Sequence, residues 1–190
     1  MTGGLSKTRF VVMAGLPGTG KTALAEALAN RLGGVVLSKD RVRAALFPPG
    51  AIEYSAAQDD FCMTVILQAA QQIVTSRQVS FIFLDGRTFS RASQIEPVVH
   101  AAAAAGVDYS ILYLRCPDSL ALERIAVGRE SHLAANRDAD LYFRVKASFE
   151  PITLPKLEVD TSAPMEHCVE LCASYLENGS DARSRARISH

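Results

Sequence analysis

The sequence predicts an α/β fold in which one parallel sheet of five strands is covered by helices on both faces. Short apolar runs, typical of strands buried on both faces, recur along the chain and alternate with segments of helical spacing. Strands joined through helices pair in parallel, and the connecting helices then cover the sheet. The five expected strands are Phe10–Ala14, Val35–Leu37, Phe81–Leu84, Ile111–Leu114 and Leu157–Val159.

Helices are expected between and after these strands. The first carries leucines at helical spacing and ends at Gly33-Gly34, because glycine readily adopts the backbone conformation that terminates a helix. The chain length suits one domain, which we assign to residues 1–177, and the polar tail at 178–190 is expected to be disordered. The other expected helices are Arg41–Phe47, Ala56–Ser76, Arg91–Ala105, Ser119–Val127, Ala139–Phe149 and Met165–Leu176.

The composition limits the class of protein. A formal net charge of zero and a pI near 6.9 provide no overall positive field for long nucleic acid or an anionic membrane. The longest apolar runs are too short for a membrane span, and Met1–Arg9 has no apolar leader segment. The four cysteines lack metal-ligand spacing, which favours buried thiols in a reducing compartment. We therefore expect a cytoplasmic protein.

A glycine-rich segment links the first strand to the first helix. Its letters, Gly15-Leu16-Pro17-Gly18-Thr19-Gly20-Lys21-Thr22, match the phosphate-binding motif G-x-x-x-x-G-K-S/T in full. Glycines let backbone N–H groups point at phosphate oxygens, and the helix N-terminus adds its dipole. Lys21 is expected to act catalytically on the β- and γ-phosphates, and Thr22 to ligate Mg²⁺. The sequence thus predicts a P-loop NTPase fold with ATP and Mg²⁺ as cofactors, bound by Gly15, Gly18, Thr19, Gly20, Lys21 and Thr22.

The third strand favours phosphoryl transfer over hydrolysis. It ends in Asp85 after four apolar residues, the form of a Walker B strand, and Asp85 is expected to hold the metal and, with Arg87, to line the acceptor site. A motor-type ATPase usually places Glu after this Asp to activate water, whereas Gly86 follows here. The sequence has no N-K-x-D segment to read guanine. A kinase instead needs a carboxylate near the acceptor hydroxyl and arginines that neutralise charge.

Asp40 and Arg43 follow the second strand. At the carboxyl edge of the sheet Asp40 would accept the hydroxyl proton, and Arg43, one helical turn later, would hold an anionic group of the acceptor. Alternatively, Asp40 caps a helix that begins at Arg41, a role that is compatible with catalysis. Glu53 and Tyr54 are either pocket residues or part of an ordinary exposed loop.

The polar segment at about 128–138 is predicted to form a lid. Lid closure brings guanidinium groups onto the phosphates and excludes water, which prevents wasteful hydrolysis of ATP. Arg124 and Arg129 are placed for this task, with Arg129 as a catalytic residue, whereas Arg144 is expected on a solvated helix face.

Three segments together resemble a family of small P-loop kinases. The branch contains the polynucleotide 5′-hydroxyl kinases, the zeta toxins and bacterial kinases often labelled AAA-type ATP-binding proteins. The resemblance covers roughly Phe10 to Glu177 and is carried by the phosphate-binding loop, by Lys39-Asp40-Arg41-Val42-Arg43 and by Arg124 to Arg129.

The resemblance implies a role for several residues. Asp40 would be the general base and Arg43 would contact the acceptor, while Asp85 would lie near both acceptor and metal. Arg124 and Arg129 would be the lid arginines. The adenine would lie between Arg124 and the loop Asp160-Thr161-Ser162, which adds Thr161 to the nucleotide-binding residues.

The sequence therefore predicts an ATP-dependent kinase that phosphorylates a hydroxyl of a small molecule, such as a metabolite, a nucleoside, an antibiotic or a sugar nucleotide. A polynucleotide or RNA 5′-hydroxyl kinase is one alternative, but the sequence shows no basic groove and no series of stacking aromatic residues. A nucleotide-binding switch without turnover is the other, and it would have no use for Asp40, Asp85 or the lid arginines. The sequence gives no basis for an oligomeric state.

Overall fold

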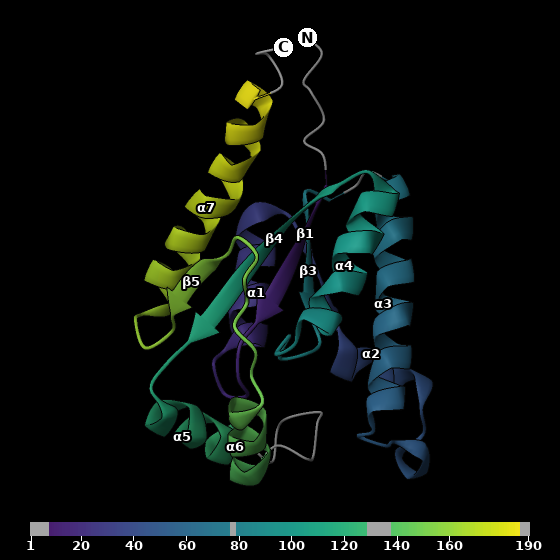
Figure 1. The fold of residues 1–190 in the computed structure, drawn as a ribbon, viewed down its shortest axis with the longest axis vertical. Helices are drawn as coiled ribbons and strands as arrows, with labels where there is room; N and C mark the ends of the chain where they lie inside the picture. The colour runs from purple at the N-terminus through teal and green to yellow at the C-terminus, as the bar shows by residue number, and fades with distance from the viewer. Residues whose placement is uncertain (1–7, 77–78, 129–137, 187–190) are drawn as a thin grey trace.

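Five strands form one parallel sheet in the order β2-β3-β1-β4-β5 (Figure 1), which confirms the predicted architecture. The computed structural model describes residues 8–76, 79–128 and 138–186. β4 starts earlier than its apolar run because Asp108, Tyr109 and Ser110 pair with the start of β1. The strands are β1 (Arg9–Ala14), β2 (Val35–Ser38), β3 (Phe81–Asp85), β4 (Asp108–Arg115) and β5 (Leu157–Asp160).

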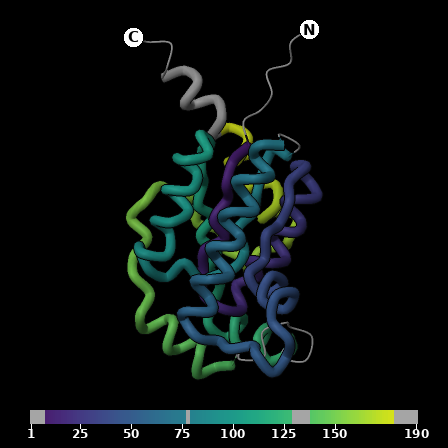
Figure 2. Tube along the Cα trace, turned by 90° about the vertical axis from the view of Figure 1, so that its right-hand side faces the viewer, coloured from purple at the N-terminus to yellow at the C-terminus, as the bar shows by residue number. Residues whose placement is uncertain are grey.

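Alternate side chains of β1 belong to two separate cores. Phe10 and Val12 pack with α3 (Ala56–Ser76) and α4 (Ala92–Ala105). Val11 and Met13 pack with α1 (Lys21–Leu32) and α7 (Met165–Ala186) on the opposite face. Figure 2, which looks at the molecule from the α3 side, shows α3 in front of the strands and α7 behind them. Burial on both faces explains why the strands read as continuous apolar runs.

The helix boundaries agree closely with the predictions, except at the end of α7. This helix continues to Ala186, through most of the segment that we expected to be a disordered tail. The expectation rested on polarity, which argues against burial but not against a helix. The remaining helices are α1 (Lys21–Leu32), α2 (Lys39–Leu46), the short 3-10 helix η1 (Pro49–Ala51), α5 (Asp118–Gly128), α6 (Ala139–Ala147) and α7 (Met165–Ala186).

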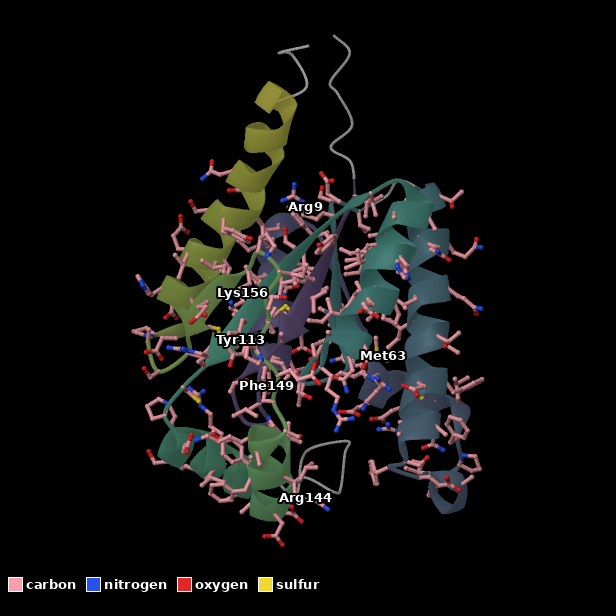
Figure 3. The ribbon with its side chains drawn as sticks, viewed as in Figure 1. Arg9, Met63, Tyr113, Arg144, Phe149 and Lys156 are labelled. Atoms are coloured by element: carbon pink, nitrogen blue, oxygen red, sulfur yellow. The ribbon has the colours of Figure 1, made fainter. Side chains whose placement is uncertain are left out.

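Helices α5 and α6 pack together beyond the carboxyl ends of the strands (Figure 1). Tyr142 of α6 is fully buried and donates a hydrogen bond to Asp118 Oδ1 at 2.8 Å, and Lys146 pairs with the same carboxylate. The bonds from Lys146 and Tyr142 lower the pKa of Asp118. Tyr113 of β4 packs against Phe149, with ring centroids 5.6 Å apart, and so ties the end of this helix pair to the sheet (Figure 3).

Buried thiols lie in the core between α7 and the sheet, as predicted. Cys168 and Cys172 are both buried, and the four cysteines of the chain are free thiols. Within the described ranges, no helix has both the length and the apolar character needed to cross a membrane.

The buried thiol of Cys172 leads to a prediction about alkaline stability. Burial raises the pKa of Cys172 from 9.0 to about 12. Because the pKa is higher in the folded state, the stabilisation by the neutral thiol is complete below the unfolded pKa and is lost as the pH rises through the folded one. We expect Cys172→Ala to reduce the fall in Tm between pH 9 and pH 12. Thermal unfolding followed by circular dichroism across this range measures the slope.

Cys116→Ala is the matched control, because Cys116 is only partly buried and lies outside that core. This variant should keep the wild-type slope. An unchanged slope in Cys172→Ala would show that titration of this thiol does not govern alkaline unfolding.

Candidate active site

The predicted phosphate-binding loop connects β1 to α1, and close packing of its glycines fixes its shape. Gly18 has a φ of 78°, and a Cβ atom there would lie 2.3 Å from the carbonyl oxygen of Ala121 in α5. A Cβ atom at Gly15 would lie 2.4 Å from the carbonyl oxygen of Leu114. Only glycine fits at these positions. The loop is therefore held tightly between β4 and α5, at the N-terminus of α1, the arrangement with which this motif binds phosphate.

Lys21 spans the inside of this loop. Its Nζ atom donates hydrogen bonds to the carbonyl oxygens of Gly15 at 2.9 Å and Leu16 at 2.7 Å, and only 7% of the residue is exposed. A buried ammonium group at a helix N-terminus provides the concentrated positive charge that phosphate groups require. The position of Lys21 is thus suited to the predicted contact with phosphates.

Thr22 and Asp85, the two predicted metal ligands, lie next to each other. Thr22 Oγ1 donates a hydrogen bond to Asp85 Oδ2 at 2.7 Å, and Asp85 is buried at the end of β3. In the described part of the chain, no group of three or more His, Cys, Asp or Glu side chains is arranged to hold a metal. Two oxygen ligands suit Mg²⁺, which usually completes its coordination with water and substrate phosphates. The two residues therefore fit a magnesium ion that binds together with a nucleotide.

Arg124 and Thr161, the two residues expected to flank the adenine, contact each other directly. The guanidinium group of Arg124 donates to Thr161 Oγ1 at 3.2 Å and to its carbonyl oxygen at 2.8 Å. Thr161 Oγ1 in turn donates to the carbonyl oxygen of Thr19 at 3.0 Å. Beside it, hydrogen bonds from Ser162 lower the pKa of Asp160. These hydrogen bonds join α5, the phosphate-binding loop and the loop after β5.

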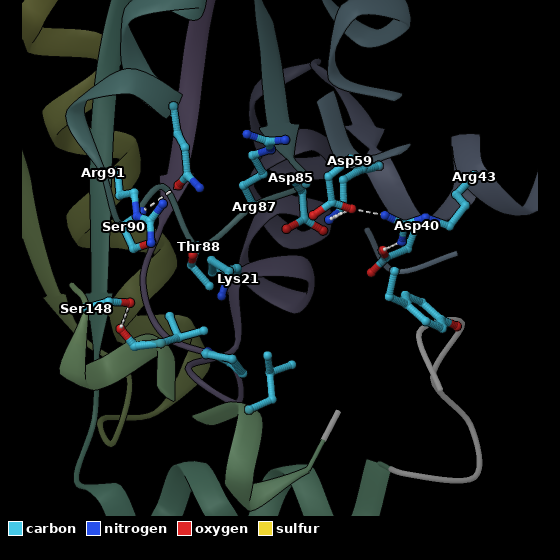
Figure 4. Close-up of a pocket in the computed structure, with 17 residues that line it drawn as sticks. Lys21, Asp40, Arg43, Asp59, Asp85, Arg87, Thr88, Ser90, Arg91 and Ser148 are labelled. Atoms are coloured by element: carbon cyan, nitrogen blue, oxygen red, sulfur yellow. Dashed lines mark hydrogen bonds and ion pairs between the residues drawn. The ribbon is translucent and has the colours of Figure 1, made fainter. Parts of the chain in front are cut away.

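A cavity of about 320 Å³ lies beside the phosphate-binding loop, lined by Lys21 and by residues that follow β2 and β3 (Figure 4). Its lining includes the four predicted acceptor residues Asp40, Arg43, Asp85 and Arg87. Tyr54 also lines the cavity, whereas Glu53 is not among the lining residues. The side-chain oxygen of Glu53 instead accepts a hydrogen bond from Ser55 at 3.4 Å.

Asp40 lies in the first turn of α2 rather than at its cap. The helix begins at Lys39 with Ser38 as the capping position, so the alternative that Asp40 caps a helix starting at Arg41 is wrong. Arg43 Nη1 lies 3.0 Å from Asp40 Oδ1. The i,i+3 spacing brings the two side chains together on one helix face.

Asp59 of α3 joins this cluster and was missed by the sequence analysis. Its carboxylate pairs with Arg43 Nη2 and, at 2.7 Å, with Lys39 Nζ. Burial lowers the pKa of Lys39, and the neighbouring Asp59 counteracts this effect. The guanidinium of Arg43 also lies over the ring of Tyr54, 5.2 Å from its centroid. No motif near Asp59 indicated this role, because the residue reaches the cavity only through packing of α2 against α3.

The sequence analysis also missed Arg91 at the start of α4 and Leu141, Val145 and Ser148 from the α6 region, all of which line the cavity. Arg129, the predicted catalytic lid arginine, lies outside the described residues. Arg144 is exposed on α6 at the outer end of the molecule, as expected for a solvated face (Figure 3).

Several solved structures share this fold. A gluconokinase from Sinorhizobium meliloti is 18% identical with a TM-score of 0.65, over 97% of this chain and 99% of that chain. A sugar kinase from Janibacter sp. is 20% identical with a TM-score of 0.59, over 90% of this chain and 95% of that chain. The APS kinase CysC from Mycobacterium tuberculosis, in complex with AMPPNP and APS, is 17% identical with a TM-score of 0.67, over 90% of this chain and 98% of that chain. At such identities the likeness establishes the fold alone.

The sequence itself matches a family model. No curated protein matches the chain. A model described as an AAA domain, however, matches residues 10–152, which is well over half of the chain and runs from Phe10 in β1 to Ile152 after α6. The match includes the phosphate-binding loop, Asp40, Asp85 and Arg124. The chain therefore belongs to the AAA domain family, within the P-loop NTPase fold that its sheet order and its phosphate-binding loop define.

Proposed function

We propose that this protein is an ATP-dependent kinase that transfers a phosphoryl group to a hydroxyl of a small molecule. One observation carries the proposal: a carboxylate that could accept a proton, Asp40, lines the same cavity as Lys21 of the phosphate-binding loop and Asp85. A hydrolase or a pure nucleotide binder has no need for an acceptor cavity beside its phosphate site. The names of the similar structures, which include a gluconokinase and a sugar kinase, support a small acceptor.

In this proposal each residue has one task. Asp40 takes the proton of the acceptor hydroxyl, and the hydroxyl oxygen of the acceptor bonds to the γ-phosphorus of ATP. At the same time the bond between that phosphorus and the oxygen retained by ADP breaks. Arg43 orients the Asp40 carboxylate through the 3.0 Å ion pair. Lys21 and the lid arginines Arg124 and Arg129 bind and neutralise the phosphates. Thr22 and Asp85 hold Mg²⁺, which when bound supplies positive charge to the phosphate oxygens.

A screen for ADP release tests the proposal. Purified protein with ATP and Mg²⁺ is offered sugars, sugar acids, nucleosides, aminoglycoside antibiotics, sugar nucleotides and 5′-hydroxyl oligonucleotides. We expect stimulation by one class of small molecule and none by oligonucleotides, and mass spectrometry should find the acceptor heavier by one phosphoryl group.

Two results of the screen would change the assignment. Stimulation by oligonucleotides alone would favour the polynucleotide kinase. ATP binding without stimulation by any compound would favour the nucleotide-binding switch.

A further inference from the structure

The acceptor cavity is richer in positive than in negative side chains. Five cationic residues line it, compared with three carboxylates. The two surplus positive charges are not spread evenly over the cavity. Their location indicates where a negatively charged group of an acceptor would bind. The cations are Lys21, Lys39, Arg43, Arg87 and Arg91, and the carboxylates are Asp40, Asp59 and Asp85.

The positive charges at the α2 end are already compensated within the protein. Arg43 pairs through Nη1 with Asp40 and through Nη2 with Asp59, and its residue is only 3% exposed. Lys39 pairs with Asp59 as well. Arg43, the residue that the sequence analysis chose to hold an anionic group, therefore has both terminal nitrogens occupied. An anion of the acceptor would have to compete with two carboxylates there.

Away from α2, the cavity is lined by donors that are paired only in part or not at all within the described ranges. Arg91 is exposed to the cavity, and within the described ranges no side chain pairs or hydrogen-bonds with its guanidinium group. Arg87 pairs through Nη2 with Asp60, and its buried Nε, like the Nε of Arg43, has no hydrogen-bond partner in the described structure. Gln94 lines the same side, and its side-chain oxygen is occupied by the backbone N–H of Ser90 at 2.9 Å. The amide N–H donors of Gln94 have no hydrogen-bond partner within the described ranges and are available to a ligand.

The charged residues are distributed along one cavity of small-molecule size. Figure 4 shows Arg91 and Arg43 at opposite sides of the cavity, with Asp85, Arg87 and Lys21 between them. A volume of about 320 Å³ suits a compact metabolite rather than a polymer. Guanidinium groups bind carboxylates and phosphates through paired, charge-assisted hydrogen bonds.

We propose that the acceptor is an anion, a hydroxylated carboxylate or phosphate whose oxyanion binds to Arg91 and Arg87, with its reacting hydroxyl at Asp40. This inference rests on the proposed kinase function and adds the chemical class of the substrate. It also gives Arg43 a positioning role toward Asp40 instead of a contact with the anion.

Acceptor pairs that differ in charge test the inference. Gluconate is compared with the neutral polyol sorbitol, and a hexose phosphate with the neutral hexose, in the ADP-release assay at saturating ATP. We expect only an anionic member of a pair to stimulate ADP release, and the two pairs distinguish a carboxylate from a phosphate. Arg91→Gln should raise the KM for that acceptor about 10- to 100-fold, as expected for the loss of charge-assisted hydrogen bonds, and leave the KM for ATP unchanged.

Two further variants make the comparison specific. Arg91→Lys keeps the charge but not the paired geometry and should give an intermediate KM. Arg31→Gln, an exposed arginine in the last turn of α1, is the matched control and should behave as wild type. Stimulation by the neutral member as strong as by its anionic counterpart would overturn the inference. So would an Arg91→Gln effect on the KM for ATP in place of the KM for the acceptor.

Thermal-shift binding of the same four compounds, with an ATP analogue present, separates this inference from the kinase proposal. Stabilisation by an anionic compound that Arg91→Gln abolishes supports the anion site even if ADP is never released, in which case the kinase proposal fails. Strong ADP release with neutral compounds alone supports the kinase proposal and overturns the anion site. If neither assay detects an anionic compound, the inference is wrong.

Discussion

Lys21→Ala is expected to lower kcat/KM for ATP-dependent phosphorylation about 100- to 1,000-fold, the loss typical when one charge-stabilising group is removed from an active site. Lys21 contributes in two ways. Its ammonium supplies charge at the N-terminus of α1, and its hydrogen bonds to Gly15 and Leu16 brace the loop from inside. Binding of a fluorescent ATP analogue and steady-state ADP release measure the two effects.

Lys156→Ala is a suitable control for this variant. Lys156 also donates a hydrogen bond from Nζ to a backbone carbonyl, that of Ile152 at 2.9 Å, but it does not line the acceptor cavity. The Lys156→Ala variant should therefore keep both ATP binding and turnover. Full activity in Lys21→Ala, with normal thermal stability, would mean that the glycine-rich loop is not the phosphate site.

Asp40→Asn is expected to lower kcat about 100- to 10,000-fold, the range for removal of a general base. The asparagine keeps the size of the side chain and an oxygen near Arg43, but it cannot accept the hydroxyl proton. The KM for ATP should stay close to the wild-type value, because Asp40 does not belong to the phosphate-binding loop. Single-turnover phosphorylation measures the chemical step directly.

Asp59→Asn is the informative comparison for Asp40. Asp59 lines the same cavity and pairs with the same Arg43, but it also neutralises Lys39. Removing its charge leaves a buried lysine without its partner, so the variant should lose stability more than it loses kcat at a temperature where it is folded. A severe loss of kcat in Asp59→Asn together with a mild one in Asp40→Asn would transfer the role of general base to Asp59.

The parts of the site that the sequence predicted consist of residues in a continuous motif or directly at the end of a strand. A run of eight residues defines the phosphate-binding loop, so its place between β1 and α1 followed from the letters alone. Asp85 was predicted because it ends an apolar strand, and Asp40 because it follows one. In a parallel sheet the strand ends meet at one edge, and the pairing of Ser38 with Asp85 shows this directly.

The parts that the sequence could not predict depend on contacts between distant elements. Asp59 and Arg91 carry no motif, and each enters the cavity only because its helix packs where it does. The length of α7 was missed for a different reason: the residues after Leu176 are polar, and polarity does not distinguish a solvated helix from a disordered tail.

The sequence by itself thus determined the fold and the place of the phosphate-binding loop, because apolar runs specify buried strands and one continuous motif forms the loop. Only the tertiary structure decided how the proposed acceptor cavity is charged. Arg43 proved to be neutralised by Asp40 and Asp59, and Arg91 was placed on the opposite side of the cavity. Charge balance in this cavity depends on distances between side chains from α1, α2, α3, β3 and the segment between β3 and α4, and long-range packing sets those distances.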